Sequence, residues 1–483
     1  MTRSKGAVGC AVLAVASAIV LAGPSVFPTG TTTYDPGQAW NGYTVLSPLG
    51  GQAAIVIDMN GNIVKQWDGY NSSAGGPARI LPGGVVVGAA GANPPLQEST
   101  ELIQRDFDGK ELWRFDHNEQ IQTRDAQTKE AKTIWSSRQH HDWQREDFPA
   151  GYYSPDATPD LSGSNTLLLT HTNHVRPKVS PAMLEDDRII EISWEGKILW
   201  QWVASDHIDE FHFDDDARKA IESPPAGRGG NAGPGGNAGR TGTGPAGNAG
   251  RGAFYWMHTN SAAYVGPNHW YDEGDKRFAP KNIIISSRNS SFLAIIAHDG
   301  SARDGSIVWQ LGPDFSASPE LRAIRQIIGQ HDAHFIPKGL PGAGDLLVFD
   351  NGGPSGYGKP SSIALNGQNI YARATSRVLE IDPVTLKLVW SYTSPTFFAT
   401  NISGAQRLPN GNTLVTEGPD GRLFEVTKDS KIVWEYIYPE FTGARASNSV
   451  YRGYRLPYSW IPQIARPKEV AVTPPAAGKF RVP

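Results

Sequence analysis

Cysteine is almost absent from this sequence, which contains one, Cys10, in 483 residues. A chain with a single cysteine forms no internal disulfide, so the fold must be stabilised by its packed core. Cys10 lies in the N-terminal apolar run described below. The rest of the chain therefore offers no thiolate for metal binding or for nucleophilic attack.

Strong charge and long apolar runs are also scarce. The 44 basic and 48 acidic residues give a net charge of −4, which indicates neither a nucleic-acid partner nor binding to an anionic membrane surface. The one long uncharged apolar run, residues 7–23, follows Arg3 and Lys5. This order is typical of an export signal, and the run is slightly short of the ~20 residues that span a membrane. We expect residues 1–25 to be a signal peptide, with an uncleaved membrane anchor as the alternative, and the protein to be periplasmic or extracellular.

Glycine, proline and tryptophan are frequent, with 53, 36 and 14 residues. Many turns and aromatic side chains favour an all-β protein over a helical one. One phrase recurs: an apolar strand, a turn, and a second strand that contains tryptophan. The six copies end at Trp67, Trp113, Trp200, Trp309, Trp390 and Trp434. Recurrence of one small unit predicts a repeat architecture.

Five of these hairpins are preceded by another apolar strand, such as NTLLLTH at 165–171, and by a shorter segment upstream of it. Each unit then has four strands, and six such units predict an all-β protein with a six-bladed β-propeller. We place the propeller at residues 35–465. Residues 223–252 form a flexible Gly- and Asn-rich insertion, and residues 466–483 form a Pro-rich tail.

Three histidines, His141, His258 and His331, hold similar places at the start of the first strand of a unit. His171, Arg288 and Asp350 lie at the end of the second strand. In an antiparallel sheet these two strand ends lie on the same side. The side chains should therefore surround one mouth of the central channel, which makes that mouth the candidate active site.

His331 is the strongest candidate for a nucleophile. A neutral imidazole can attack phosphorus or sulfur if its other nitrogen has an acceptor, such as a backbone carbonyl or a side chain. His258 or His141 could act as the acid for the leaving group. A transferred anionic group also needs fixed donors, which Arg288 and Asn260 could supply.

Other interpretations of these side chains are open. Three histidines could bind Zn²⁺ or Cu²⁺, but the neighbouring Arg288 disfavours a cation, so we expect no metal ligand here. His171 could contact the site from behind, although a surface position is favoured for both His171 and His174. The acidic segment 206–216 could bind Ca²⁺, but a solvated loop or short helix is favoured.

At these residues the sequence resembles the bacterial arylsulfotransferase family, the PAPS-independent aryl-sulfate sulfotransferases. The similar motifs are HHDWQ at 140–144, WMHTNSAAYV at 256–265 with NIIISSRNSS at 282–291, GQHDAHF at 329–335 with LLVFDNG at 346–352, SGAQRLPNGNTLVTEGPDGRLFEV at 403–426 and VYRGYRLPYSWIPQ at 450–463. The similarity covers most of the chain from about Trp40 to Gln463.

The resemblance implies an exported six-bladed propeller that moves a sulfuryl group from a phenolic sulfate ester to a phenol. It implies a ping-pong route through a sulfated histidine, with no cofactor and no nucleotide donor. By motif, His331 would be the nucleophile, and His258, Asn260 and Arg288 would bind the sulfate. His141 would complete the ring of polar contacts, and Asp332 and His171 are further candidates for substrate binding.

Two other functions are compatible with a propeller of this kind. Strand phrases that end in Trp also occur in quinone-dependent dehydrogenases, which would carry a coloured cofactor. A binding propeller without enzymatic activity would recognise a polysaccharide or a protein. The identity of the phenols and the oligomeric state are left open by the sequence.

Overall fold

The computed structural model describes residues 29–71, 76–92, 97–125, 128, 130–223, 253–357, 371–441 and 447–474. The expected signal segment at 1–25, all but the first residue of the 223–252 insertion, and the end of the tail at 466–483 lie outside these ranges. Within the described ranges, no helix has the length and apolar character needed to cross a membrane.

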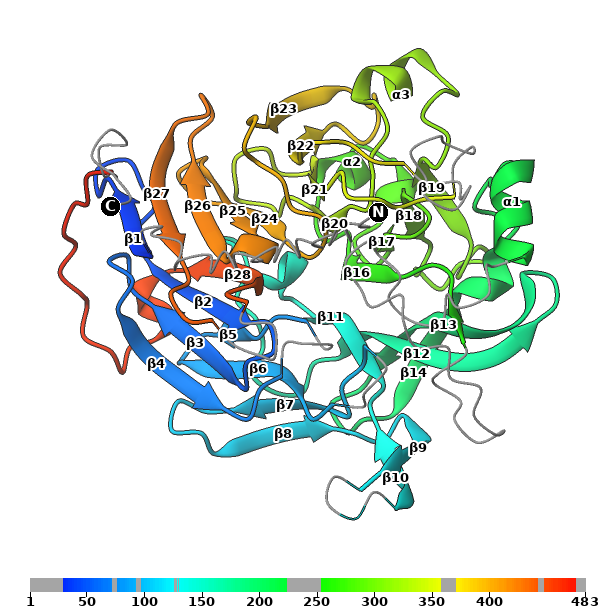
Figure 1. Ribbon diagram of the computed structural model, residues 1–483, viewed down its shortest axis with the longest axis horizontal. Helices are drawn as coiled ribbons and strands as arrows, with labels where there is room; N and C mark the ends of the chain where they lie inside the picture. Colours follow the sequence, from blue (N-terminus) through cyan, green and yellow to red (C-terminus); the bar gives the residue numbers. More distant parts are fainter. Residues whose placement is uncertain are drawn as a thin grey trace, which may run out of the picture.

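Six antiparallel sheets surround a central axis, so the protein is the all-β six-bladed propeller that the sequence predicted (Figure 1). From the axis outward, blade 1 has strands β28 (Val450–Leu456), β2 (Tyr43–Pro48), β3 (Ala53–Ile57) and β4 (Ile63–Asp68). Blade 2 has β5 (Arg79–Leu81), β6 (Val85–Ala90), β7 (Glu101–Arg105) and β8 (Glu111–Phe115). Blade 3 has β11 (Gln139–Arg145), β12 (Thr166–Arg176), β13 (Ser180–Ile192) and β14 (Ile198–Val203), and β15 (Phe254–Tyr255) pairs with β13.

The other three blades follow in chain order. Blade 4 has β16 (Thr259–Tyr264), β17 (Ile283–Ser287), β18 (Phe292–Ile296) and β19 (Ile307–Leu311). Blade 5 has β20 (His331–Phe335), β21 (Leu346–Asp350), β22 (Arg377–Ile381) and β23 (Leu388–Tyr392). Blade 6 has β24 (Gly404–Arg407), β25 (Thr413–Glu417), β26 (Arg422–Val426) and β27 (Ile432–Ile437), with β1 (Gly30–Tyr34) as a fifth strand outside β27.

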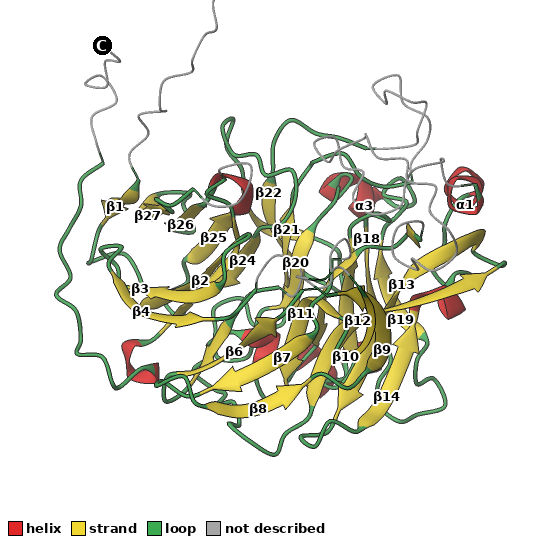
Figure 2. Cartoon of the chain, turned by 60° about the horizontal axis from the view of Figure 1, so that its bottom comes forward, coloured by secondary structure: helices red, strands yellow, loops and turns green. Residues whose placement is uncertain are grey.

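Short elements lie around the blades (Figure 2). The hairpin of β9 (Glu119–Arg124) and β10 (Ala131–Ser136) projects between blades 2 and 3 and was not predicted. The helices are α1 (Asp215–Glu222), α2 (His269–Asp272) and α3 (Pro319–Ile324), and the 3-10 turns are η1 (Pro149–Gly151), η2 (Ala204–His207), η3 (Lys276–Phe278), η4 (Gly418–Asp420) and η5 (Tyr458–Trp460). Most of these segments connect strands and leave the blades intact.

The recurring tryptophans join each blade to the next. The indole N–H of Trp67 in blade 1 donates to Asp106 O in the outer turn of blade 2, at 3.0 Å. The same bond recurs around the ring: Trp113 to Trp194 O, Trp200 to Asp304 Oδ2, Trp309 to Pro383 O, Trp390 to Lys428 O, and Trp434 in blade 6 to Met59 O in blade 1. In all six cases the acceptor lies on the neighbouring blade, so each bond joins two blades. Five of the tryptophans hold the same register in their hairpins, whereas Trp67 lies two residues further along its strand and Lys65 holds the equivalent place.

The ring is closed by strands from the two ends of the described chain. β28 supplies the inner strand of blade 1 and pairs with β2, while β1 pairs with β27 of blade 6. The sequence pattern indicates an inner strand for five units only, and the sixth is this C-terminal strand. Arg455 of β28 fixes the closure, because its guanidinium bonds to Glu425 Oε2 of blade 6 at 3.0 Å and to Thr44 Oγ1 at 2.7 Å.

Removing this buried cation should weaken the whole ring. Arg455 and Glu425 are both fully buried, so Arg455→Ala leaves an unpaired carboxylate in the interior. We expect a loss of about 3–5 kcal/mol of unfolding free energy, measured by urea denaturation. Arg466→Ala is the matched control, because its ion pair with Glu469 has an arginine side chain that is 70% exposed. That change should cost at most about 1 kcal/mol, and equal losses in the two variants would contradict the role of Arg455.

Candidate functional site

The three histidines do lie at the starts of the inner strands, and two of them, His141 and His331, share one register position. The last paired residues of β11, β16 and β20 are Arg145, Tyr264 and Phe335, and each pairs with the first residue of the next strand. Counted back from them, His141 and His331 are both four residues earlier, whereas His258 is six residues earlier. The expectation of equivalent places in the repeat is therefore confirmed for His141 and His331 and wrong for His258.

Bulges at these strand ends explain the difference. The register shifts between Gln139 and Trp143 in β11, between Thr259 and Ser261 in β16, and between His331 and His334 in β20. His141 and His258 have φ values of 52° and 51°, an uncommon left-handed conformation for residues other than glycine. Such bulges re-aim side chains and are over-represented beside active sites.

His141 and His258 meet as predicted. Their ring centroids are 4.9 Å apart, and Tyr255 stacks on His258 at 4.4 Å. Tyr451 of β28 approaches His141 at 6.1 Å. His141, His258 and His331 are all buried, with exposed fractions of 6, 8 and 2%. We call these three side chains, together with Arg288, Asn260, Asn351 and Arg452, the histidine site.

The position of His331 is fixed through one ring nitrogen. Nδ1 lies 2.7 Å from Asn351 Oδ1 and 3.0 Å from Gly329 O. The Asn351 amide cannot be reversed, because its Nδ2 donates to Ala399 O and Ile402 O. Both partners of Nδ1 are therefore acceptors, so Nδ1 carries the proton and Nε2 has the free lone pair. These are the two kinds of acceptor that the sequence analysis anticipated.

Burial and neighbouring cations keep the site histidines neutral. Burial, together with Arg452 and Arg288, holds the pKa of His331 well below its usual value of 6.5. Burial, then His141 and Arg288, lower the pKa of His258 well below that value. Burial, then His171 and Arg452, do the same for His141. A neutral imidazole with a free Nε2 is the form that can act as a nucleophile.

Arg288 and Asn260 hold blade 4 to the site. Arg288 follows β17, is half-buried, and its backbone N–H donates to His258 O at 3.1 Å. Asn260 donates through Nδ2 to Gln330 O at 2.7 Å, which ties it to the strand that carries His331. Its Oδ1 is buried and has no hydrogen-bond partner among the described residues.

Arg452 is the site residue that sequence reasoning missed. It lies on β28, where it donates from Nη2 to Asn260 O and from Nε to Ser403 O, both at 3.0 Å. Its motif, VYRGYRLP, was noted for its resemblance alone, because only the closure of the ring shows that β28 is an inner strand. Asn351 was missed for a related reason, since its role depends on a contact across two strands.

Asp332 and His171, the other predicted substrate-binding residues, are both buried and held by neighbouring side chains. Asp332 forms an ion pair with Arg452 at 3.2 Å and accepts from Ala405 N, so it links blades 5 and 6. His171 is fully buried and stacks on His140 with centroids 3.7 Å apart. The favoured surface position for His171 was wrong. Burial would lower its pKa, but the carboxylates of Glu185 and Glu98 raise it.

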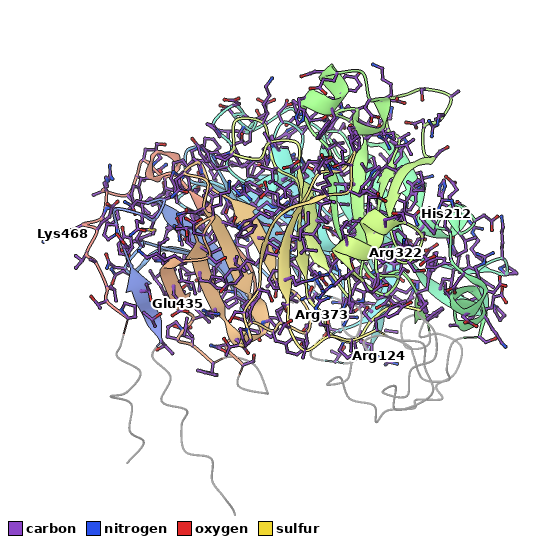
Figure 3. All side chains as sticks on the ribbon, turned by 90° about the horizontal axis from the view of Figure 1, so that it is seen from above. Arg124, His212, Arg322, Arg373, Glu435 and Lys468 are labelled. Carbon is purple, nitrogen blue, oxygen red and sulfur yellow. The ribbon has the colours of Figure 1, made fainter. Side chains whose placement is uncertain are left out.

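The acidic segment 206–216 is a loop that leads into helix α1, as favoured from the sequence. Asp214 caps α1 by accepting from Ala217 N. Asp209 pairs with Lys178 and Arg218, and His207 with Glu210. His212 of this segment lies at the outer edge of the molecule (Figure 3). These acidic side chains thus cap a helix or form ion pairs at the edge of the propeller, away from the histidine site.

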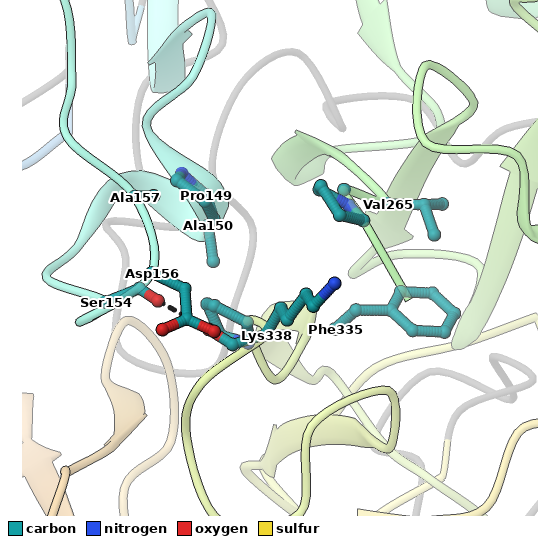
Figure 4. Close-up of a pocket in the computed structure, with 11 residues that line it drawn as sticks. Pro149, Ala150, Ser154, Asp156, Ala157, Val265, Phe335 and Lys338 are labelled. Atoms are coloured by element: carbon teal, nitrogen blue, oxygen red, sulfur yellow. Dashed lines mark hydrogen bonds between the residues drawn. The ribbon is translucent and has the colours of Figure 1, made fainter. Parts of the chain in front are cut away.

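A surface pocket lies at the opposite end of the inner strands. It is lined by residues after β11, β16 and β20, among them Ser154, Asp156, Val265 and Lys338 (Figure 4). The histidines are at the starts of these strands and Val265 follows the end of one. The pocket therefore opens at the other mouth of the channel and takes no part in the site.

Comparison with known proteins identifies one family. The sequence profile described as Arylsulfotransferase (ASST) matches residues 142–440, more than half of the chain. No curated protein sequence matches.

Solved structures resemble the chain only distantly. A protein of unknown function from Bacteroides caccae is 11% identical, with a TM-score of 0.41 over 86% of this chain and 98% of its own. A streptogramin B lyase is 11% identical, with a TM-score of 0.33 over 85% and 83%. A europium-containing methanol dehydrogenase is 13% identical, with a TM-score of 0.32 over 82% and 80%. These likenesses are too distant to bear on function.

The low pKa of His331 makes a prediction about stability. The folded site excludes a proton that the unfolded chain binds below about pH 6.5, so unfolding becomes easier as the pH falls through that value. Such a group changes the unfolding free energy by up to about 1.4 kcal/mol per pH unit. We expect His331→Gln to reduce the slope of unfolding free energy between pH 6.5 and 5 by about that amount. His117→Gln, in a side chain that is 66% exposed, controls for the loss of a histidine. An unchanged slope in His331→Gln would show that the fold does not lower the pKa of His331.

Proposed function

This chain belongs to the arylsulfotransferase (ASST) family, and from that premise we propose that it transfers a sulfuryl group between phenols through a sulfated His331. The donor is a phenolic sulfate ester and the acceptor a second phenol. The reaction is ping-pong: the donor's phenol leaves before the acceptor's phenol attacks.

The observation that carries this proposal is the geometry of His331. Its Nδ1–H is held by Asn351 Oδ1 and Gly329 O, and within the described residues no hydrogen bond reaches Nε2. The lone pair of Nε2 is therefore available at a fixed position. A buried histidine with one nitrogen anchored and the other free is the arrangement that nucleophilic catalysis requires.

In the first half-reaction Nε2 of His331 attacks the sulfur of the donor. The Nε2–S bond forms while the bond between sulfur and the phenolic oxygen breaks, and the electron pair leaves with the phenolate. Positive charge then develops on the ring, and Nδ1–H shares it with Asn351 Oδ1 across a 2.7 Å hydrogen bond. The phenolate takes a proton from His258 or His141 and departs.

The two arginines of the site would bind the anionic sulfuryl group. Arg288 and Arg452 are near enough to His331 to lower its pKa, so they also attract an anionic ester to the same place. The bound sulfate carries the opposite charge, and it raises the pKa of the imidazoles beside it. His258 and His141 are neutral in the empty site, and they gain a proton to donate only when substrate is bound.

The second half-reaction runs in reverse with a new phenol. The acceptor's hydroxyl gives its proton to His258 or His141, and its oxygen attacks the sulfur. The Nε2–S bond breaks, and His331 returns to its neutral form with Nδ1 still protonated. No nucleotide donor takes part in either half.

We also propose that the reaction takes place outside the cytoplasm. The support is the order of Arg3, Lys5 and the uncharged apolar residues 7–23, which is typical of export signals. The propeller has no cysteine, so an oxidising compartment would leave it unchanged.

Loss of His331 should abolish transfer. With a chromogenic aryl sulfate, an added phenol and no nucleotide, the wild type should release phenol and His331→Ala should release none above background. The expected fall is at least about 10⁴-fold, the scale seen when a covalent nucleophile is removed. His298→Ala is the control, a histidine that bonds Glu191 at 2.5 Å between blades 3 and 4, and it should keep its activity.

Mass spectrometry then tests the intermediate. Wild type incubated with donor alone should carry one sulfuryl group on the peptide that contains His331. Release that survives in His331→Ala would move the nucleophile to His258 or His141. No release from any aryl sulfate would favour a binding propeller, and a coloured protein would favour a quinone-dependent enzyme.

Asn351 should act as a positioning residue. Asn351→Ala removes one acceptor of Nδ1 and leaves Gly329 O at 3.0 Å, so the ring keeps its tautomer but loses its orientation. We expect kcat to fall by about 10–100-fold, as for loss of a supporting hydrogen bond, while KM changes little. Stopped-flow measurement of the first phenol released separates this effect from a folding defect, because a slower rate with full amplitude indicates a chemical defect and a reduced amplitude indicates misfolded protein. A raised KM with unchanged kcat would contradict the role.

A further inference from the structure

We propose that His140, His171 and Asp187 form a binding site for a divalent transition-metal ion in blade 3, directly behind the histidine site. The three side chains are fully or almost fully buried, with exposed fractions of 0, 0 and 1%. Their ligand atoms all lie within 4.8 Å of one another.

The site is built on three adjacent strands of one sheet. His140 comes from β11, His171 from β12 and Asp187 from β13. His171 and Asp187 are direct cross-strand partners, and Gln139, the neighbour of His140, pairs with Thr170, the neighbour of His171. Directly opposed residues of an antiparallel pair point to the same face of the sheet. Donors on packed strands keep their geometry better than donors on loops.

Each of the three residues has one ligand atom without a hydrogen-bond partner among the described residues. The atoms are Nε2 of His140, Nε2 of His171 and Oδ1 of Asp187. Asp187 Oδ1 is 3.3 Å from His140 Nε2 and 3.8 Å from His171 Nε2. Buried polar atoms are almost always paired, so three orphans this close together call for a shared partner. Tetrahedral ligands at ~2.0–2.1 Å from zinc are ~3.3 Å apart. The His140 and His171 rings are stacked with 14° between their planes, so one imidazole must rotate about its side-chain bonds before both Nε2 atoms point to one ion.

The other ring nitrogens are already held as they are in metal sites. His171 Nδ1 lies 3.3 Å from Glu98 Oε2, and a carboxylate behind a ligating imidazole is the usual support for such a ligand. His140 Nδ1 lies 2.8 Å from His141 Nδ1 and 3.3 Å from the hydroxyl of Tyr255. In both rings the nitrogen that faces away from the proposed ion is occupied, and the one that faces it is unoccupied.

Charge also favours a cation. Glu98, Glu185 and Asp187 are buried carboxylates beside these imidazoles, and Arg138 pairs with Glu98 at 3.1 Å. Among the described residues, Glu185 and Asp187 have only histidines as ion-pair partners. Buried carboxylates are costly when charged, and one divalent ion reduces that cost.

The donor set indicates the class of metal. Two imidazole nitrogens and one carboxylate oxygen suit Zn²⁺ and Fe²⁺ and do not suit Ca²⁺ or Mg²⁺, which prefer oxygen ligands. These residues differ from the three histidines of the channel, which the sequence analysis had considered for Zn²⁺ or Cu²⁺ and had rejected because of Arg288. Blade 3 holds no arginine in contact with His140 or Asp187 among the described ion pairs.

The metal is tested by direct binding, with no substrate present. Full-length protein is stripped with EDTA and titrated calorimetrically with Zn²⁺, and with Fe²⁺ and Mn²⁺ under anaerobic conditions. We expect one equivalent of Zn²⁺ or Fe²⁺ to bind, and the melting temperature to rise with metal concentration. The metal content of the protein as purified identifies which ion it acquires in the cell.

Variants then locate the ion. His171→Gln should weaken binding by at least about 100-fold, and Glu98→Gln by about 10–100-fold. His174→Gln is the matched control, because His174 lies on the same strand and bonds Asp186 at 2.8 Å, and it should bind as the wild type does. Folded His171→Gln that binds equally well would overturn the proposal.

The wild type alone also decides the question if the variants fail to fold. No binding of any of the three ions would overturn the proposal and leave a proton shared among the two imidazoles and Asp187. The result is independent of sulfuryl transfer, because a protein that binds metal and does not turn over aryl sulfates would support this site and refute the proposed function.

Discussion

Each inner strand of this propeller is the edge of a sheet inside the protein. The N–H groups on its channel side need acceptors that no further strand provides. At blades 4, 6 and 1, side chains of the preceding blade supply them. Asp142 and Gln144 of blade 3 accept from Ala262 N and Tyr264 N of blade 4, at 3.1 and 2.7 Å. Asp332 and Gln406 do the same for Ala405 N and Arg455 N, at 3.1 and 2.7 Å. Unpaired buried backbone groups are costly, so these polar residues are structural requirements of the channel.

The histidine site depends on that arrangement. Asp332 accepts from blade 6 and also holds Arg452, which in turn bonds the backbone of Asn260. Blades 1, 4, 5 and 6 are thus linked through a few buried side chains around His331. Buried polar networks of this kind hold the strands that share them in one arrangement. Within that arrangement, Asn351 and Gly329 O give His331 one defined tautomer.

The features that recur in each blade could be predicted from the sequence. The features that depend on contacts between blades could not. Trp67 and its five counterparts were visible because the same bond to the next blade is made six times. The convergence of His141 and His258 followed from antiparallel pairing. Their register did not, because bulges shift each strand by a different amount. Arg452 and the burial of His171 could not be found from spacing, since one depends on ring closure and the other on a strand that continues beyond the blade.

Closure by β28 has a consequence for how activity arises during synthesis. His141, His258 and His331 are translated well before Val450–Leu456, the strand that brings Arg452 to the channel. Until that strand docks against β2, blade 1 lacks its inner edge and His331 lacks one of its two flanking cations. Growing chains and chains that have lost this strand carry all three histidines without the complete charge. The charge around His331 is therefore complete only in the closed ring, so the last inner strand to be made decides when the site is whole.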